Sequence, residues 1–172
     1  MFNANNRPGQ LFQTHKRRVM NRSAATVAVG DVLALDMLGT ATETAAGQGV
    51  GGITGLDLAD AIFHNAVAVA TGNADGLIVV VKSLLSGSGA DNTEVEVALC
   101  SQRIGVLCEG TTDVVIGDRL IPVAGQVYLV TNAQAATAHT VAYALEGQTS
   151  ATPAVVDVCF FGGVPCNTID DT

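Results

Sequence analysis

A chain of 172 residues, 48% of them hydrophobic and 14% charged, has the length of one domain and can bury a substantial core. Its hydrophobic content excludes intrinsic disorder for most of the chain, and no apolar run is long enough to span a membrane. Aromatic residues make up only 4% and there are nineteen glycines, which favours closely packed strands with tight turns over a helical bundle.

Positive charge gathers near the N-terminus, although the formal net charge of the chain is -8. Five of the eight basic residues precede position 23, whereas the first acidic residue is Asp31. The remaining residues hold three bases against sixteen acids, so their charge balance is -13. We therefore expect two parts, an extended basic N-terminal arm over residues 1–22 and a β-rich body domain over residues 23–172.

Apolar residues are interleaved with the basic residues of this arm, so it can contact a partner through both kinds of side chain. Such a peptide can order on an acidic protein surface by strand addition and by Arg–carboxylate pairing. The expected contact residues are Arg7, Leu11, Phe12, Lys16, Arg17, Arg18, Met20 and Arg22. Removal of the arm is expected to leave the body folded. The alternative partner is nucleic acid, against which stand the acidic body and the scarcity of aromatic residues for stacking.

The region after the arm gives few clear signals. "TVAVGDVLALD" (26–36) predicts a strand interrupted by a Gly-Asp pair, and "AAGQGVGGITG" (45–55) predicts a flexible loop. Three glycines in that loop fit the letters of a dinucleotide-binding fingerprint, but the buried strand before it and the helix after it are missing. "LDLADAIFHNAV" (56–67) has apolar residues near helical spacing and predicts one short helix, with a strand as the alternative. Residues 37–75 otherwise match no pattern.

From residue 76 onward, short apolar runs alternate with Gly, Asn, Asp and Ser at the spacing of sandwiches and barrels. The runs cover residues 76–85, 93–100, 103–110, 118–123, 126–132, 140–147 and 154–162. Alternation is clearest in "TEVEVALC", where Glu94 and Glu96 face one side and Val95 and Val97 face the other. The sequence therefore predicts an all-β fold with a small barrel-like body.

A Gly-Asp pair recurs in "VAVGDVLAL" (27–35) and "VVIGDRLIP" (114–122). The pattern predicts a turn at the glycine, an aspartate that bonds its own backbone, and a strand that follows. Two copies indicate related halves of a barrel, although so short a similarity among valines can also arise by chance.

No motif for catalysis or for metal or cofactor binding stands out. The four cysteines lack C-x-x-C spacing, and three lie in or beside apolar runs, so we interpret them as buried small hydrophobic residues. The three histidines have no zinc-site spacing, and no serine-hydrolase or P-loop string is present. We expect no enzyme, no cofactor and no metal; an active site assembled from distant segments, using His64 or His139, is the alternative.

A series of motifs in the C-terminal part points to a family. In order they are a "G-V-x-x-E-G" strand (105–110), a Gly-Asp entry into "R-L-I-P" (117–122), "G-Q-V-Y-L-V-T" (125–131), "A-L-E" (144–146) and a final valine-rich strand. With this order of elements, residues 97–163 resemble the C-terminal two-thirds of capsid decoration, or cement, proteins of tailed bacteriophages. The basic arm is similar to the extended arms with which some cement proteins hold the shell.

The resemblance implies a β-barrel or β-tulip body, commonly a homotrimer, on the outer surface of a head built from an HK97-like major capsid protein. Such a protein is made in the bacterial host cytoplasm, binds after the head expands and braces it against internal DNA pressure. The resemblance implies no catalysis. From the residues themselves we expect no membrane partner, and nucleic acid stays the less favoured alternative.

Overall fold

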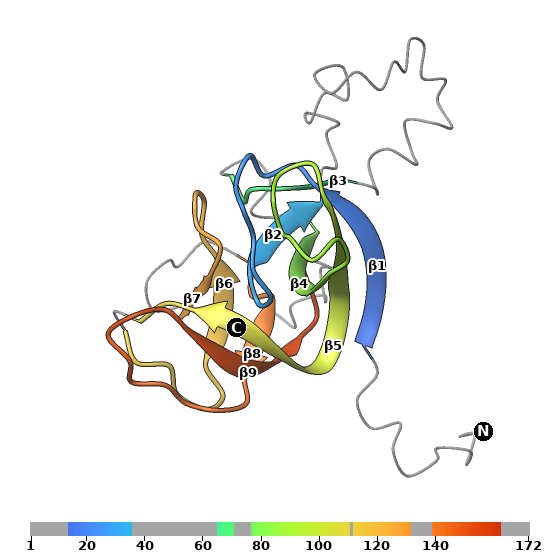
Figure 1. Ribbon diagram of the computed structural model, residues 1–172. Coiled ribbons are helices and arrows are strands. Elements are labelled where there is room, and N and C mark those ends of the chain that lie inside the picture. Colours follow the sequence, from blue (N-terminus) through green and yellow to red (C-terminus); the bar gives the residue numbers. More distant parts are fainter. Residues whose placement is uncertain (1–13, 36–64, 71–76, 111, 132–138, 163–172) are drawn as a thin grey trace, which may run out of the picture.

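The computed structural model describes residues 14–35, 65–70, 77–110, 112–131 and 139–162, and these residues contain strands and turns but no helix (Figure 1). The strands are β1 (Thr14–Asn21), β2 (Val32–Leu35), β3 (Asn65–Val67), β4 (Ile78–Leu84), β5 (Glu94–Cys108), β6 (Arg119–Pro122), β7 (Leu129–Thr131), β8 (Ala142–Ala144) and β9 (Ala154–Phe160). The expectation of an all-β, barrel-like body is confirmed.

The long strand β5 organises the sheet. Its first half pairs antiparallel with β1 and β4, and its second half pairs antiparallel with β9 and meets β7 in parallel. The pairings close two circuits that share β5: the first is β1–β3–β2–β4–β5 and the second is β5–β7–β6–β8–β9. In Figure 1, β5 bends between the group β1 to β4 and the group β6 to β9.

The sequence indicated two strands where the structure has the single strand β5. The polar residues between the two apolar runs form an irregularity in that strand instead of a turn. The register with β1 shifts between His15 and Lys16, and the register with β9 shifts between Ser101 and Ile104. Ser101 is only 3% exposed, and its hydroxyl is bonded within the sheet. Because a bulge bends a strand without ending it, β5 can serve both circuits.

The buried apolar residues within the described ranges form two clusters. One contains Leu33, Val79 and Val97 with their neighbours in the first circuit, and the other contains Val32, Val80 and the inward residues of the second circuit. Alternate residues of β2 and β4 thus supply both clusters. These strands are buried on both faces, which explains their unbroken apolar sequences "VLAL" and "IVVV". The two circuits therefore pack as one body.

Both Gly-Asp pairs form the predicted turn. Gly30 and Gly117 have φ values of 98° and 91°, which side-chain-bearing residues rarely adopt. The Asp31 carboxylate accepts a hydrogen bond of 2.7 Å from the Ala28 N–H, and Asp118 accepts one of 2.8 Å from the Val115 N–H. β2 follows the first turn and β6 the second, and in its circuit each is separated from β5 by one strand, β4 or β7. The repeated motif therefore builds the same turn at the same place in both circuits.

The helix expected over residues 56–67 lies mostly outside the described residues. Its last three residues form β3, which pairs in parallel with β1 and antiparallel with β2. Asn65 and Ala66 are both buried there, so the strand alternative holds for this end of the segment.

The boundary expected at residue 22 does not separate two parts of the structure. Residues 14–21 are extended, as expected of an arm, but they form β1 of the body's own sheet, paired with β5 from Thr14 to Met20. Val19 is 2% exposed and belongs to the core of the first circuit. The sequence did not predict that Val19 points inward, because residues 15–18 before it are basic or histidine. Residues 1–13 lie outside the described part.

Candidate functional site

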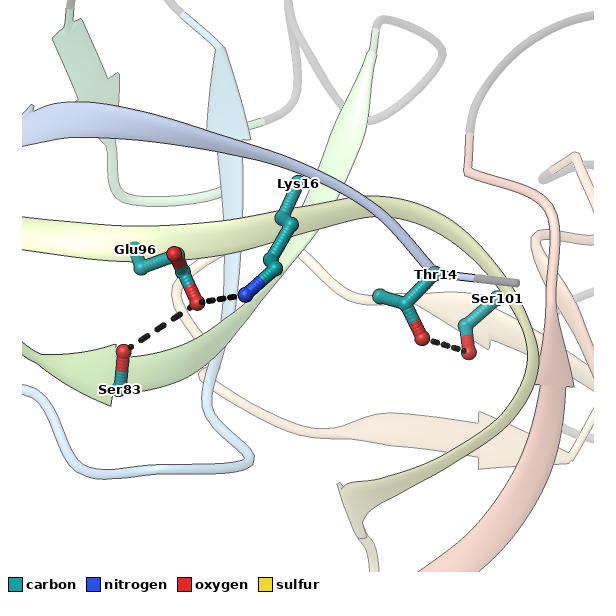
Figure 2. A network of polar contacts seen from close by, with 5 residues as sticks. All are labelled: Thr14, Lys16, Ser83, Glu96 and Ser101. Carbon is teal, nitrogen blue, oxygen red and sulfur yellow. Dashed lines mark hydrogen bonds and ion pairs between the residues drawn. The ribbon is translucent and has the colours of Figure 1, made fainter. Parts of the chain in front are cut away.

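The outward side of β1 and of the start of β5 carries charges of both signs, and we call Lys16, Arg18, Glu94 and Glu96 the charged face. Lys16 Nζ donates to Glu96 Oε1 at 3.2 Å, and Ser83 Oγ of β4 lies 3.5 Å from the same oxygen (Figure 2). Arg18 lies directly opposite Glu96 in the strand register. Val95 and Val97 are buried, so the predicted division of this strand into a wet side and a dry side is confirmed.

The charge on this face is balanced, because two bases stand beside two acids of the same body. The Lys16 side chain is 49% exposed, so its ion pair with Glu96 contributes little to stability. The pair instead restricts the position of the ammonium group. A face of this kind can meet a protein surface of mixed charge, whereas a phosphate backbone attracts uncompensated bases.

The structure brings together only some of the expected contact residues. Lys16 and Arg18 are exposed on β1, and the half-buried Met20 lies opposite Glu94. Arg17 is half-buried and opposite the core residue Val97, on the other side of the strand. Arg22 follows β1, and its guanidinium donates to the Asn92 side chain at the opposite end from Thr14. Arg7, Leu11 and Phe12 lie outside the described residues.

A hydroxyl pair fixes the point at which the chain enters the sheet. Ser101 Oγ donates its hydrogen to the Arg103 carbonyl at 2.8 Å, so the Thr14 hydroxyl is the donor in its 2.7 Å bond to Ser101. Figure 2 shows the pair at the bend of β5. Residues 1–13 are therefore joined to the body at the junction of the two circuits.

Asn21 holds the other end of β1, and the sequence reasoning missed it. Its side chain is fully buried; the Nδ2 group donates to the Gly89 carbonyl at 2.8 Å and to the Ala25 carbonyl at 2.9 Å. Its Oδ1 accepts from both the N–H and the O–H of Ser23. The signal available in the sequence was its spacing of two from Val19, which places both side chains on the inward side.

In the part of the chain that the structure describes, two ionisable groups have pKa values changed by burial. Burial raises the pKa of Asp31, although the hydrogen bond from the Ala28 N–H opposes this change. Burial also raises the pKa of the Cys108 thiol to about 12. Cys100 and Cys159 are half-buried and, like Cys108, are free thiols. Among these three described cysteines, the interpretation as a buried hydrophobic residue holds fully for Cys108 alone. Cys166 and His64 lie outside the described residues.

The described part of the chain has no cluster of three or more metal-ligating side chains, and none of its elements is a helix that could cross a membrane. His15 and His139 are exposed. No protein-family model matches the chain, and no curated protein matches it at a significant level.

Proposed function

We propose that this protein is a capsid cement protein that binds the outer surface of an icosahedral tailed-phage head and stabilises its expanded form. One observation carries the proposal: the segment that resembles cement proteins, residues 97–163, spans one structural unit. It runs from the first half of β5 to the residues just after β9 and includes the strands that close the second circuit. The segment thus includes the second circuit, and it begins within the half of β5 that also pairs with β1 and β4.

The motifs of that segment lie partly in and partly beside the strands expected for them. The "G-V-x-x-E-G" motif ends β5, and the Gly-Asp pair turns into β6. Gly125, with a φ of 77°, lies in the turn before β7. The "A-L-E" motif begins at the end of β8, and the valine-rich run is β9. This agreement supports the proposal over a chance similarity of valine-rich sequences.

The partner on this proposal is an HK97-like major capsid protein, and the protein itself is a homotrimer. The charged face and residues 1–13 contact the capsid, with Lys16 and Arg18 beside acidic capsid side chains. Each contact is weak, but many copies on one symmetric shell act together through their high effective concentration. The protein is made in the host cytoplasm and ends on the virion surface.

Co-sedimentation with particles tests this proposal. The purified chain is mixed with expanded heads and with unexpanded proheads of the phage that encodes it, and the bound fraction is measured. We expect binding to expanded heads alone. Retention on duplex DNA at about 150 mM salt, without binding to heads, would favour the nucleic-acid alternative instead.

A matched pair of variants tests the role of the charged face. Arg18→Gln and Gln126→Glu each lower the net charge by one, but Gln126 is exposed in the turn between β6 and β7. We expect Arg18→Gln to weaken binding to expanded heads by about three- to tenfold, and Gln126→Glu to bind like the wild type. Equal effects of the two changes would mean that only net charge matters and that the charged face is not the contact.

A further inference from the structure

Exposed apolar side chains gather on the second circuit. Among the described residues, seven large hydrophobic side chains are exposed, and six of them lie on this circuit or against it. The six are between 41% and 70% exposed: Val29, Val115, Ile116, Tyr143, Leu145 and Val155. Together they present apolar surface on the order of 500 Å², a size at which patches on monomers often have a function. The seventh, Leu85, follows β4.

The strand register places the central members on one side of the sheet. Tyr143 of β8 lies opposite Cys159, and Val155 of β9 lies opposite Leu107 of β5. Leu145 donates its N–H to the Asp157 carbonyl at 2.8 Å, which continues the β8–β9 pairing by one residue. Residues directly opposite in a sheet share a face, and the alternate residues of β9 are buried. We call this outward side of β5, β9 and β8 the apolar face.

The two Gly-Asp turns flank the apolar face. On one edge, the Gly30 carbonyl accepts from the Leu107 N–H at 2.9 Å, and a Cβ added to Gly30 would lie 3.5 Å from Val155 Cγ2. On the other edge, the Gly117 N–H donates to the Ala144 carbonyl at 2.9 Å, and the Ala144 N–H donates to the Asp118 carbonyl at 3.0 Å. The second residue of each turn, Val29 or Ile116, is therefore an exposed β-branched side chain on a braced turn.

The charges on the apolar face are of both signs. Arg103 of β5, whose side chain is 56% exposed, forms an ion pair with Asp157 of β9. Glu146 accepts a hydrogen bond of 3.0 Å from the Asp157 N–H. The face thus offers one base and two acids beside its apolar side chains, so a second copy would meet groups of both signs there. A chain with a net charge of -8 repels its own copies elsewhere on its surface.

From these observations we infer that the apolar face binds further copies of this chain, with the Val29 edge of one copy against the Ile116 edge of the next. Contacts between two different edges close into a ring when the rotation between copies allows it. Each interface takes one edge from each copy, and a stable interface needs roughly 800 Å² from each partner, so the polar surroundings of each edge are part of the contact. The number of copies, three, rests on the proposed function, whereas the face itself rests on the contacts above.

Sedimentation equilibrium of the full chain without capsids tests the inference. The variants Val29→Asp and Ile116→Asp change one edge each, and Leu85→Asp makes the same substitution at an exposed apolar residue outside the face. We expect a wild-type trimer that tightens between about 50 and about 500 mM NaCl, because salt screens the repulsion between acidic copies. The edge variants should associate at least about tenfold more weakly, and Leu85→Asp should match the wild type.

A wild-type monomer at about 100 µM and both salt concentrations would overturn the inference, whatever the protein does on heads. So would edge variants that associate like the wild type. Far-UV circular dichroism checks that each variant is folded, which we expect because all three sites are exposed. If the wild type is a dimer and the edge variants are monomers, the apolar face is the contact between copies but the number of copies is not three. A trimer that fails to bind expanded heads rejects the proposed function and leaves the inference standing.

Discussion

Replacing Asn21 by alanine tests whether β1 is a structural part of the body. The buried amide connects the end of β1 to two neighbouring loops, at the carbonyls of Ala25 and Gly89. Alanine cannot make these bonds and leaves space where the amide was. The two donated bonds are worth about 1 kcal/mol each, and the lost Ser23 bonds with the unfilled space add about 1 kcal/mol more.

The expected loss is therefore about 3 kcal/mol out of the roughly 5–15 kcal/mol typical of a domain. For a chain of this size, that corresponds to a fall in Tm of about 6–12 °C. Urea unfolding followed by far-UV circular dichroism measures the free energy of unfolding, and Gln102→Ala is the control because it removes an exposed amide from β5. A loss below about 0.5 kcal/mol for Asn21→Ala, equal to that of the control, would refute the role given to β1.

Three further predictions concern the N-terminal segment, a buried carboxyl and a buried thiol. Deletion of residues 1–13 keeps every described contact and should leave the fold intact. Deletion of residues 1–22 also removes β1 and should unfold the body. If circular dichroism shows that the longer deletion still folds, the sheet pairing of β1 is contradicted. Because the folded-state pKa of Asp31 is raised, its stabilising contribution is fully present below its unfolded pKa of 3.8 and is lost as the pH rises through the folded pKa. Asp31→Asn keeps an acceptor for the Ala28 N–H but has no carboxyl group to ionise. The free energy of unfolding of this variant, measured by urea titration, should therefore rise relative to that of the wild type between pH 4 and pH 7. A difference between the two proteins that does not change with pH would contradict the raised pKa of Asp31. The pKa of Cys108 is about 12 when folded and 9.0 when unfolded, so its contribution to stability is lost as the pH rises from 9.0 toward 12. Peptide mapping after iodoacetamide treatment at about pH 8 should show Cys100 and Cys159 modified before Cys108, and equal rates would contradict its burial.

Much of the body could be predicted from the local sequence. The alternation of charged and apolar residues correctly predicted which side of the strand around Glu96 is exposed and which is buried. The two Gly-Asp pairs correctly predicted turns in which the aspartate bonds the nearby backbone. These features depend on residues close together in the chain, so the sequence contains their physical cause.

Other features depend on pairings between distant residues and left little trace in the sequence. The sequence predicted a free arm at β1 because four consecutive basic or histidine residues precede its one buried valine. β1 closes the first circuit by pairing with β5, some 80 residues away, and local sequence does not indicate such a pairing. The polar residues around Ser101 looked like a turn, because only the neighbours on both sides show that β5 continues through them. The apolar face was missed because Tyr143, Leu145 and Val155 come to lie on one side of the sheet only when β8 and β9 pair.

Imaging of decorated particles tests the proposed cement function most directly. Expanded heads mixed with the purified full chain are imaged by electron cryo-microscopy and compared with heads alone. We predict additional density for this β-rich body on the outer surface, at positions of local or true threefold symmetry, with the charged face toward the shell. Expanded heads that show no added density at saturating protein would contradict the proposal.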